Sequence, residues 1–174
     1  MNLSLRLPRS SSGWTMAVFG LLAAALGVVG LVAPDAQLAL MGLETPAGGV
    51  RAEGDHTLMF LTASSMAAVN MGVYYVLAAL ADWRAFFRWT VPFRLLTFTV
   101  FTLAVVTGRA PAGFLAVGVW EGVGALATGI ALRAETRKAA RGRAGDGMRA
   151  EVRDATRGES AAGSGAYDEN TRSR

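Results

Sequence analysis

Long apolar stretches alternate with short charged ones along the chain. Four of the apolar stretches are about twenty residues long and carry at most one charged side chain each; they run over about residues 14–33, 57–80, 90–107 and 113–132. A helix rises about 1.5 Å per residue, so each stretch can cross the hydrocarbon core of a bilayer, which is roughly 30 Å thick. The pattern therefore predicts an all-α fold, a membrane-embedded four-helix bundle over residues 14–132.

The first apolar stretch has a second interpretation as a signal peptide, because Arg6 and Arg9 in the polar segment 1–13 precede it. A signal peptide, however, has an apolar region of only about 7–15 residues. In addition, Pro34 directly follows Ala33, where a cleavage site would need a permissive residue. We therefore expect an uncleaved helix.

Residues 34–55 form the longest connection between two predicted spans. Pro34 ends the first helix, and Asp35 can cap a short new helix whose apolar side chains lie on the membrane surface. These side chains are Leu38, Leu40, Met41 and Leu43. An ordinary connector with a few buried leucines is the other interpretation, and the pattern leaves both open.

Residues 81–89 form a predicted turn that mixes charged and aromatic side chains. Two tryptophans and two phenylalanines stand among Asp82, Arg84 and Arg88. This composition is typical of a helix end at the level of the lipid headgroups. Interleaved aromatic and basic residues also occur in single-strand nucleic-acid sites. Between two spans we interpret them as a membrane anchor, and we expect no nucleic acid as a partner.

The composition changes sharply at Arg133. Residues 133–174 contain almost no large apolar side chain, many glycines and charges of both signs. Such a segment cannot bury a core of its own. We expect a basic, largely disordered tail, apart from a first turn or two that continue the fourth helix.

The overall composition and the placement of charge agree with a membrane protein. The chain is 52% hydrophobic and only 17% charged, which is unlike a soluble domain of this size. Basic residues gather before the first span, in the turn 81–89 and at the start of the tail, whereas the other two loops carry only Arg51 and Arg109. Cytoplasmic loops are the ones enriched in Lys and Arg. We therefore expect a multi-pass protein of the plasma or inner membrane with both termini cytoplasmic.

Basic residues at the start of the tail are expected to contact anionic lipid headgroups. They are Arg133, Arg137, Lys138, Arg141 and Arg143.

Small residues recur along two of the predicted spans. Ser64, Ala68 and Gly72 are spaced four apart, and Gly118 and Gly122 with Gly129 follow in the last span. Small side chains let neighbouring helix backbones approach closely in a membrane. The pattern does not say whether the neighbour is in the same chain, a second copy of it or another membrane protein, so all three remain open.

Four polar residues lie inside the predicted spans: Asn70, Tyr74, Arg94 and Glu121. Counted back from the cytoplasmic ends at about 1.5 Å per residue, Asn70 and Glu121 lie about 18 Å deep, with Tyr74 and Arg94 at about 12 and 9 Å. A charge at mid-membrane costs about 2.5–3.5 kcal/mol on insertion scales. We therefore expect these side chains to face one another. Whether Arg94 reaches Glu121 stays open, because arginine tends to extend toward the nearer surface.

Three roles are open for this candidate cluster. It can fix the register of the bundle, form the floor of a polar pocket for a lipid-soluble ligand, or move protons or ions. A single acid without a file of polar residues is poor support for conduction. The chain has no cysteine, no HExxH, no GxSxG and no phosphate loop, so we predict no catalytic residue and no metal site. His56, the single histidine, is interpreted as an interface residue.

A series of landmarks follows the predicted spans in order. They are a first span ending at Pro34, the stretch LALMGL after it, Asn70, Gly72 and Tyr75 in the second span, a turn with Phe87 and Trp89, Arg94 in the third span and Glu121 in the fourth. This order resembles that of the DoxX-like and BphX-like group of small bacterial four-helix membrane proteins. The resemblance covers about residues 14–133. It implies a compact inner-membrane protein, and some members of the group are associated with quinol oxidation or aromatic degradation. It implies no set of active-site residues.

Two hypotheses on function follow. The first is a non-enzymatic structural or accessory membrane protein that acts through helix association with itself or with another membrane protein. The second is a membrane-embedded binding protein, or an accessory subunit of an oxidoreductase, for a quinone-like or other hydrophobic ligand near the candidate cluster. No cofactor beyond such a quinone or lipid is expected.

Overall fold

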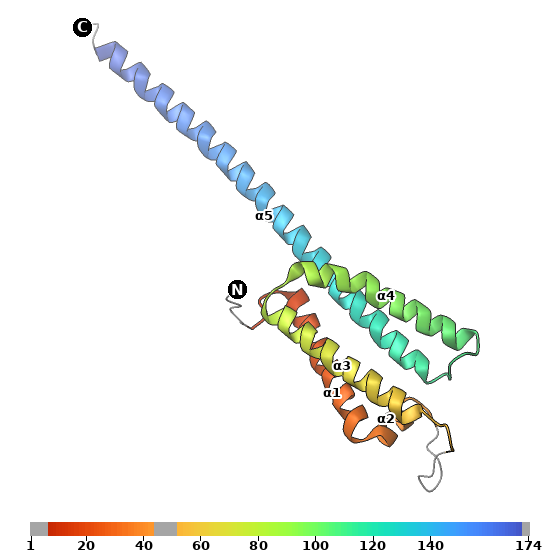
Figure 1. Cartoon of the computed structure of the whole chain (residues 1–174). Coiled ribbons are helices and arrows are strands. Elements are labelled where there is room, and N and C mark those ends of the chain that lie inside the picture. The colour runs from red at the N-terminus through yellow and green to blue at the C-terminus, as the bar shows by residue number, and fades with distance from the viewer. Residues whose placement is uncertain (1–6, 44–51, 172–174) are drawn as a thin grey trace. The chain divides into compact units, whose positions relative to one another are not determined.

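The computed structural model describes residues 7–43 and 52–171, and every regular element in these ranges is an α-helix. The helices are α1 Ser11–Val32, α2 Pro34–Leu40, α3 Thr57–Leu80, α4 Arg84–Val106 and α5 Phe114–Thr171 (Figure 1). Among them α1, α3, α4 and α5 are long and apolar enough to cross a membrane. The predicted all-α fold with four membrane-length helices is confirmed.

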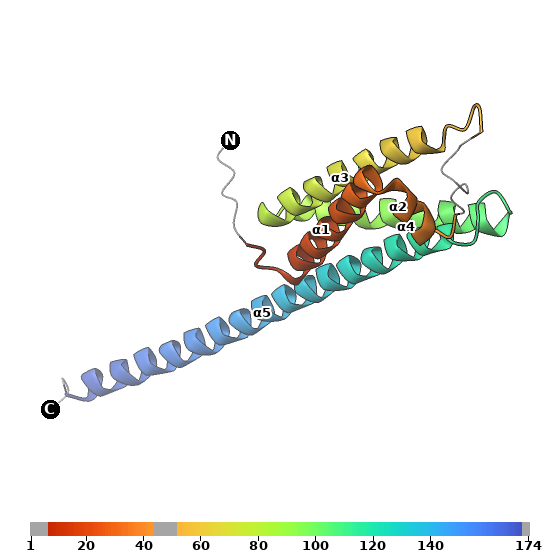
Figure 2. The same ribbon diagram turned by 90° about the horizontal axis from the view of Figure 1, so that it is seen from below.

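The helices of residues up to 133 pack as two pairs. Helix α1 lies against α3, while α4 and the first part of α5 form an antiparallel hairpin, as Figures 1 and 2 both show. Aromatic side chains join the pairs, because the ring of Phe19 on α1 stacks on Trp120 of α5 with 4.4 Å between centroids. Around Phe19 a small core forms from Met16, Tyr75 and Phe87. The core therefore receives side chains from all four long helices.

Helix α4 begins earlier than the sequence predicted. The turn is confined to the few residues before Arg84, where Asp82 adopts a positive φ of 46° and accepts a hydrogen bond from the Ser10 hydroxyl at 3.1 Å. The predicted start of the span at residue 90 is therefore six residues too late. Pro92 accordingly lies inside the helix rather than in its first turn, where it leaves the carbonyl of Arg88 without its helical N–H donor.

Glycines on both partners allow α1 and α3 to approach closely. A Cβ on Gly72 would lie 2.5 Å from the Gly20 carbonyl oxygen, and one on Gly27 would lie 2.6 Å from the carbonyl oxygen of Ser65. The expected stripe of Ser64, Ala68 and Gly72 is thus correct at Gly72, but Ser65 rather than Ser64 is the buried serine. The glycines of α1 that complete this interface were not singled out from the sequence.

The glycines of α5 pack against its own hairpin partner. A Cβ on Gly122 would lie 3.2 Å from the ring of Phe98 on α4, and one on Gly118 would lie 3.3 Å from Cβ of Phe101. For these two glycines the neighbouring helix is therefore in the same chain. Gly129 is less crowded, since its added Cβ would be 3.6 Å from Val91.

The short helix after the first span is present as α2, and it does more than connect. Leu38 is buried, whereas Leu40 is exposed. The carbonyl of Met41, directly after α2, lies so close to Gly113 that any side chain there would overlap it. The end of α2 therefore packs on the beginning of α5.

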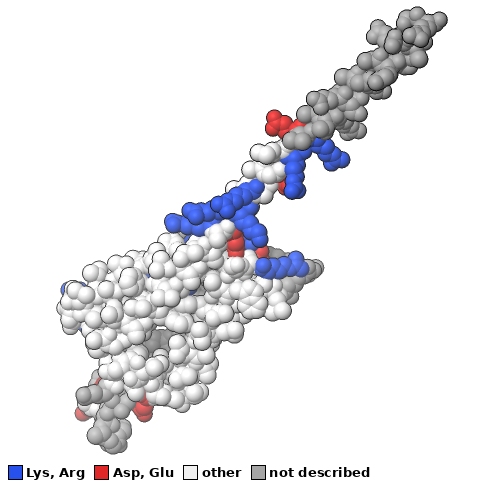
Figure 3. All heavy atoms as spheres, turned by 180° about the vertical axis from the view of Figure 1, so that it is seen from behind, with Lys and Arg blue, Asp and Glu red and all other residues white. Residues whose placement is uncertain are grey.

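Residues from Ala134 on form a second unit, which is described by itself. The expected disorder is not confirmed here, because α5 continues through these residues to Thr171. Alanine, arginine and glutamate, which favour helices, are frequent in the first turns, and a preceding helix removes the cost of nucleation. Residues 136–149 are all exposed, so this unit builds no core, as expected. Lys and Arg are prominent on it in Figure 3, where the visible face of the first unit is almost free of charge.

Some predictions fall outside the described residues. They concern the polar segment up to Arg6, the part of the first loop at 44–51 that contains Arg51, and the end of the tail at 172–174.

A Gly72→Ala substitution should destabilise the protein by about 1–3 kcal/mol, because the added methyl group meets backbone atoms that cannot move aside. The measurement is the midpoint of thermal unfolding in detergent, followed by circular dichroism. Gly129→Ala is the matched control, since it meets only an ordinary van der Waals contact and should be neutral or stabilise by up to about 1 kcal/mol through helix propensity. Equal midpoints for the two variants would contradict the close α1–α3 packing.

Candidate functional site

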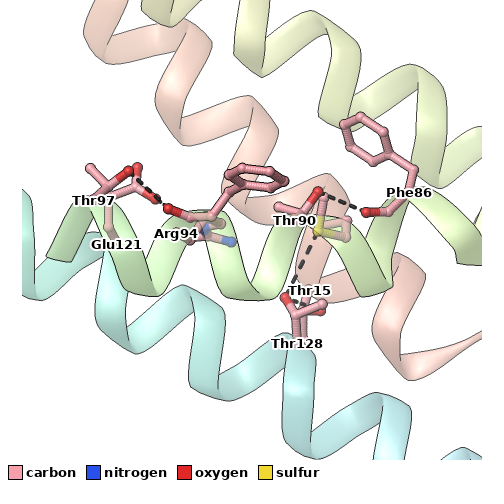
Figure 4. A network of polar contacts seen from close by, with 9 residues as sticks. Thr15, Phe86, Thr90, Arg94, Thr97, Glu121 and Thr128 are labelled. Atoms are coloured by element: carbon pink, nitrogen blue, oxygen red, sulfur yellow. Dashed lines mark hydrogen bonds and ion pairs between the residues drawn. The ribbon is translucent and has the colours of Figure 1, made fainter. Parts of the chain in front are cut away.

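Two of the four predicted polar residues meet inside the bundle. Nε of Arg94 on α4 donates to Oε2 of Glu121 on α5 at 2.9 Å (Figure 4). The side chain of Arg94 is 3% exposed and that of Glu121 is 21% exposed. Whether Arg94 reaches Glu121 was open from the sequence, and the structure shows that it does.

The other two predicted residues do not join this pair. Asn70 and Tyr74 lie on the exposed side of α3, and Tyr74 is 55% exposed. The inward face of α3 is set by Gly72 and Tyr75, and Tyr75 is only 6% exposed. The sequence contained a signal for this face. Residues three apart lie on nearly the same side of a helix, and Tyr75 is three residues after Gly72, where α1 and α3 come close together.

The guanidinium of Arg94 is enclosed by an aromatic ring and by a glycine. Its Cζ lies 3.3 Å above the centroid of the Phe19 ring and 5.8 Å from that of Tyr75, an arrangement in which a cation is attracted by the ring face. A Cβ on Gly124 would overlap Nη2 and lie 2.7 Å from Cζ. Gly124, which the sequence analysis did not single out, therefore provides the space for this side chain.

Arg94 uses only part of its hydrogen-bonding capacity. Nη1 and Nη2 are buried and have no hydrogen-bond partner among the described residues. A buried charge of this kind depends on its ion pair, and removing one partner strands the other. Arg94 and Glu121 are therefore coupled to each other in stability.

A cavity of about 370 Å³ lies between α1, α2, α3 and α5. Small side chains such as Ala23, Ala68 and Ala116 leave its space, and Trp120 and Glu121 contribute to its wall. A second cavity of about 260 Å³ adjoins it, since the two share five lining residues, and it extends to Phe101 on α4 and to two serines of α3. Together they leave a space near α2 that is partly open to the outside of the bundle.

The polar groups on the wall of the larger cavity are Gln37 of α2 and Glu121 of α5. Oε1 of Gln37 is buried, and no described residue donates to it. Glu121 accepts from Arg94 through Oε2, and no hydrogen bond to its Oε1 occurs within the described part of the chain. Gln37 was not predicted as a site residue, because it lies in a segment interpreted as a surface helix or a connector.

Other polar groups of the bundle do not line the larger cavity. Oγ1 of Thr102 on α4 is buried and has no hydrogen-bond partner among the described residues. The hydroxyls of Thr15 on α1 and Thr128 on α5 face each other in Figure 4. The distance between them is 3.2 Å, and Thr128 is fully buried. A groove of about 400 Å³ on α1 and α5 is almost wholly apolar. Within residues 7–43 and 52–171 no three His, Cys, Asp or Glu residues come together as a metal site, and His56 lies exposed at the start of α3.

Substitution of one partner of the ion pair should lower the stability of the protein more than substitution of both partners. Arg94→Met or Glu121→Met alone leaves a buried charge without its partner, which should cost about 3–5 kcal/mol. The double variant leaves no charge and should unfold at a higher temperature than either single variant. Thermal unfolding of all four proteins in one detergent tests this double-mutant cycle, and additive losses would show that the two side chains are not coupled.

Comparisons with protein-family models, with curated proteins and with solved structures found no match for this chain. The resemblance to the DoxX-like and BphX-like group therefore stays a prediction, based on the sequence landmarks alone.

Proposed function

We propose that the protein is a multi-pass membrane protein that binds a hydrophobic small molecule in the cavity between α1, α2, α3 and α5. The observation that carries this proposal is the cavity itself, which combines an apolar wall with two polar side chains, Gln37 and Glu121. Its volume of about 370 Å³ falls within the range of about 300–1,000 Å³ that is usual for ligand pockets.

The residues that line the cavity favour binding over a purely structural role. Interiors of proteins are normally packed to the density of organic crystals, and an unfilled space lowers stability in proportion to its size. Here the space persists next to Trp120 because Ala23, Ala68 and Ala116 occupy positions where larger side chains would fill it. The ion pair with Arg94 holds the Glu121 carboxylate at the wall.

The second of the two hypotheses from the sequence, binding of a hydrophobic ligand, is thus the one that the geometry supports better. A quinone-like compound belongs to this class. Association of the helices with a second copy or with another membrane protein stays a prediction.

We further propose that both termini face the cytoplasm of a cell whose plasma or inner membrane holds the bundle. The basic residues from Arg133 to Arg143 would then contact anionic headgroups, and Trp83 and Trp89, both exposed, would lie at the same interface. The cavity is lined by α2, by the middle of α1 and of α3 and by the beginning of α5. In this orientation it extends from about the middle of the membrane toward its outer side.

An Ala68→Phe substitution should remove a bound ligand without unfolding the bundle, because Ala68 lines both adjoining cavities. Mass spectrometry of molecules extracted from gently purified protein should find one hydrophobic compound enriched over bulk lipid, reduced about tenfold or more in this variant. Ala63→Phe, on the exposed side of α3, should keep the compound. An equal content in both variants, or bulk lipid alone in the native protein, would favour the structural role.

The orientation can be tested with single cysteines, because the chain has none of its own. A membrane-impermeant maleimide should label Ala52→Cys in intact cells, and it should label Ala140→Cys only after the membrane is permeabilised. Both positions are exposed, so failure to react cannot come from burial within the protein. The reverse pattern would overturn the proposed orientation.

A further inference from the structure

We propose that the bound molecule is a neutral alcohol or phenol whose hydroxyl group donates a hydrogen bond to Glu121. This inference rests on the proposed function, and it adds the chemical class of the ligand's polar end. It follows from which hydrogen-bonding positions on the cavity wall are occupied and which are open.

Glu121 favours a ligand that can donate a hydrogen bond. An ionised carboxylate can only accept hydrogen bonds, and its two oxygens offer about four lone-pair positions. Arg94 occupies Oε2 through a bond of 2.9 Å, and no described residue donates to Oε1. A buried carboxylate gains from each further donor, because hydrogen bonds to charged groups are stronger than those between neutral groups. A hydroxyl group entering the cavity supplies such a donor.

Gln37 accommodates a hydroxyl group equally well. Its Oε1 is buried without a donor among the described residues, and its amide also carries two N–H donors. A hydroxyl is both donor and acceptor, so it is compatible with either end of this amide. An ether or an ester can only accept, and it would leave the open oxygen of Glu121 unsatisfied.

The charges around the cavity disfavour ionised ligands. A carboxylate or phosphate head would lie beside Glu121, where like charges repel. Arg94 offsets only part of this repulsion, because it does not line the cavity and its Nη2 lies against Gly124, so a bound anion would be nearer to the carboxylate than to the cation. An ammonium head would in turn share Glu121 with a cation already bound at 2.9 Å. A neutral hydroxyl therefore fits better than either ion.

The test compares three probes with the same alkyl chain: 1-dodecanol, its methyl ether and dodecanoate. Each is equilibrated with the full-length protein in nanodiscs, and the bound amount is measured by mass spectrometry after subtraction of the amount in empty nanodiscs. We expect the alcohol to bind at least about tenfold more tightly than the ether, which is the effect of one hydrogen bond to a charged group. Dodecanoate should bind more weakly than the alcohol.

Two variants serve as controls. The double variant Arg94→Met, Glu121→Met removes the charged acceptor without leaving a lone charge, and its preference for the alcohol over the ether should fall to what the neutral amide of Gln37 provides. Ala68→Phe should lose both. The inference is wrong if the native protein binds the alcohol and the ether equally, or binds dodecanoate more tightly than the alcohol. The proposed function still stands in that case if Ala68→Phe abolishes binding. If neither the alcohol nor the ether binds, the inference is wrong. The proposed function is then tested separately by the compound that co-purifies with the protein.

Discussion

Hydrocarbon cannot hydrogen-bond to a protein, and this constraint governs where every polar group of the bundle lies. Arg94 and Glu121 are the only charged residues well inside the four predicted spans, and they lie on the two helices of one hairpin and pair at 2.9 Å. Neither could face lipid without a cost of several kcal/mol. The pair thus fixes the rotation of α4 and α5 about their axes, and with it the faces that they present to α1 and α3.

The close packing of α1 and α3 also follows from the hydrocarbon that surrounds the helices. Lipid is as apolar as a leucine side chain, so helices in a membrane associate through shape and van der Waals contact rather than through the hydrophobic effect. Gly20 and Gly72 meet across α1 and α3 at the distance of backbone contact. In the same way Gly124 leaves space for the guanidinium of Arg94 on the face of Phe19. The small residues therefore position both the backbones and the ion pair.

The spans could be predicted from the sequence, but the direction of their side chains could not be predicted in full. Length and the lack of charge define a membrane helix locally, which is why four of them were found. Rotation is different, because lipid-facing and inward-facing residues are both apolar and polarity gives little contrast between them. Asn70 and Tyr74 were assigned inward because they are polar, whereas Gly72 and Tyr75 mark the inward face by size and packing. The start of α4 was misplaced because an aromatic and basic composition fits a turn and a first helical turn equally.

Small residues have opposite effects at two interfaces of the bundle. Where α1 and α3 run side by side, the missing side chains are replaced by the backbone of the neighbour, and the helices touch. Between this pair and the beginning of α5, Met41 at the end of α2 rests on Gly113, and alanines of α1, α3 and α5 line the volume that remains. The result is a space rather than a contact. No periodic pattern in the sequence distinguishes these two outcomes, because both require the same residues. Helix α2 lies at the second interface, where it brings Gln37 to the wall that contains Glu121.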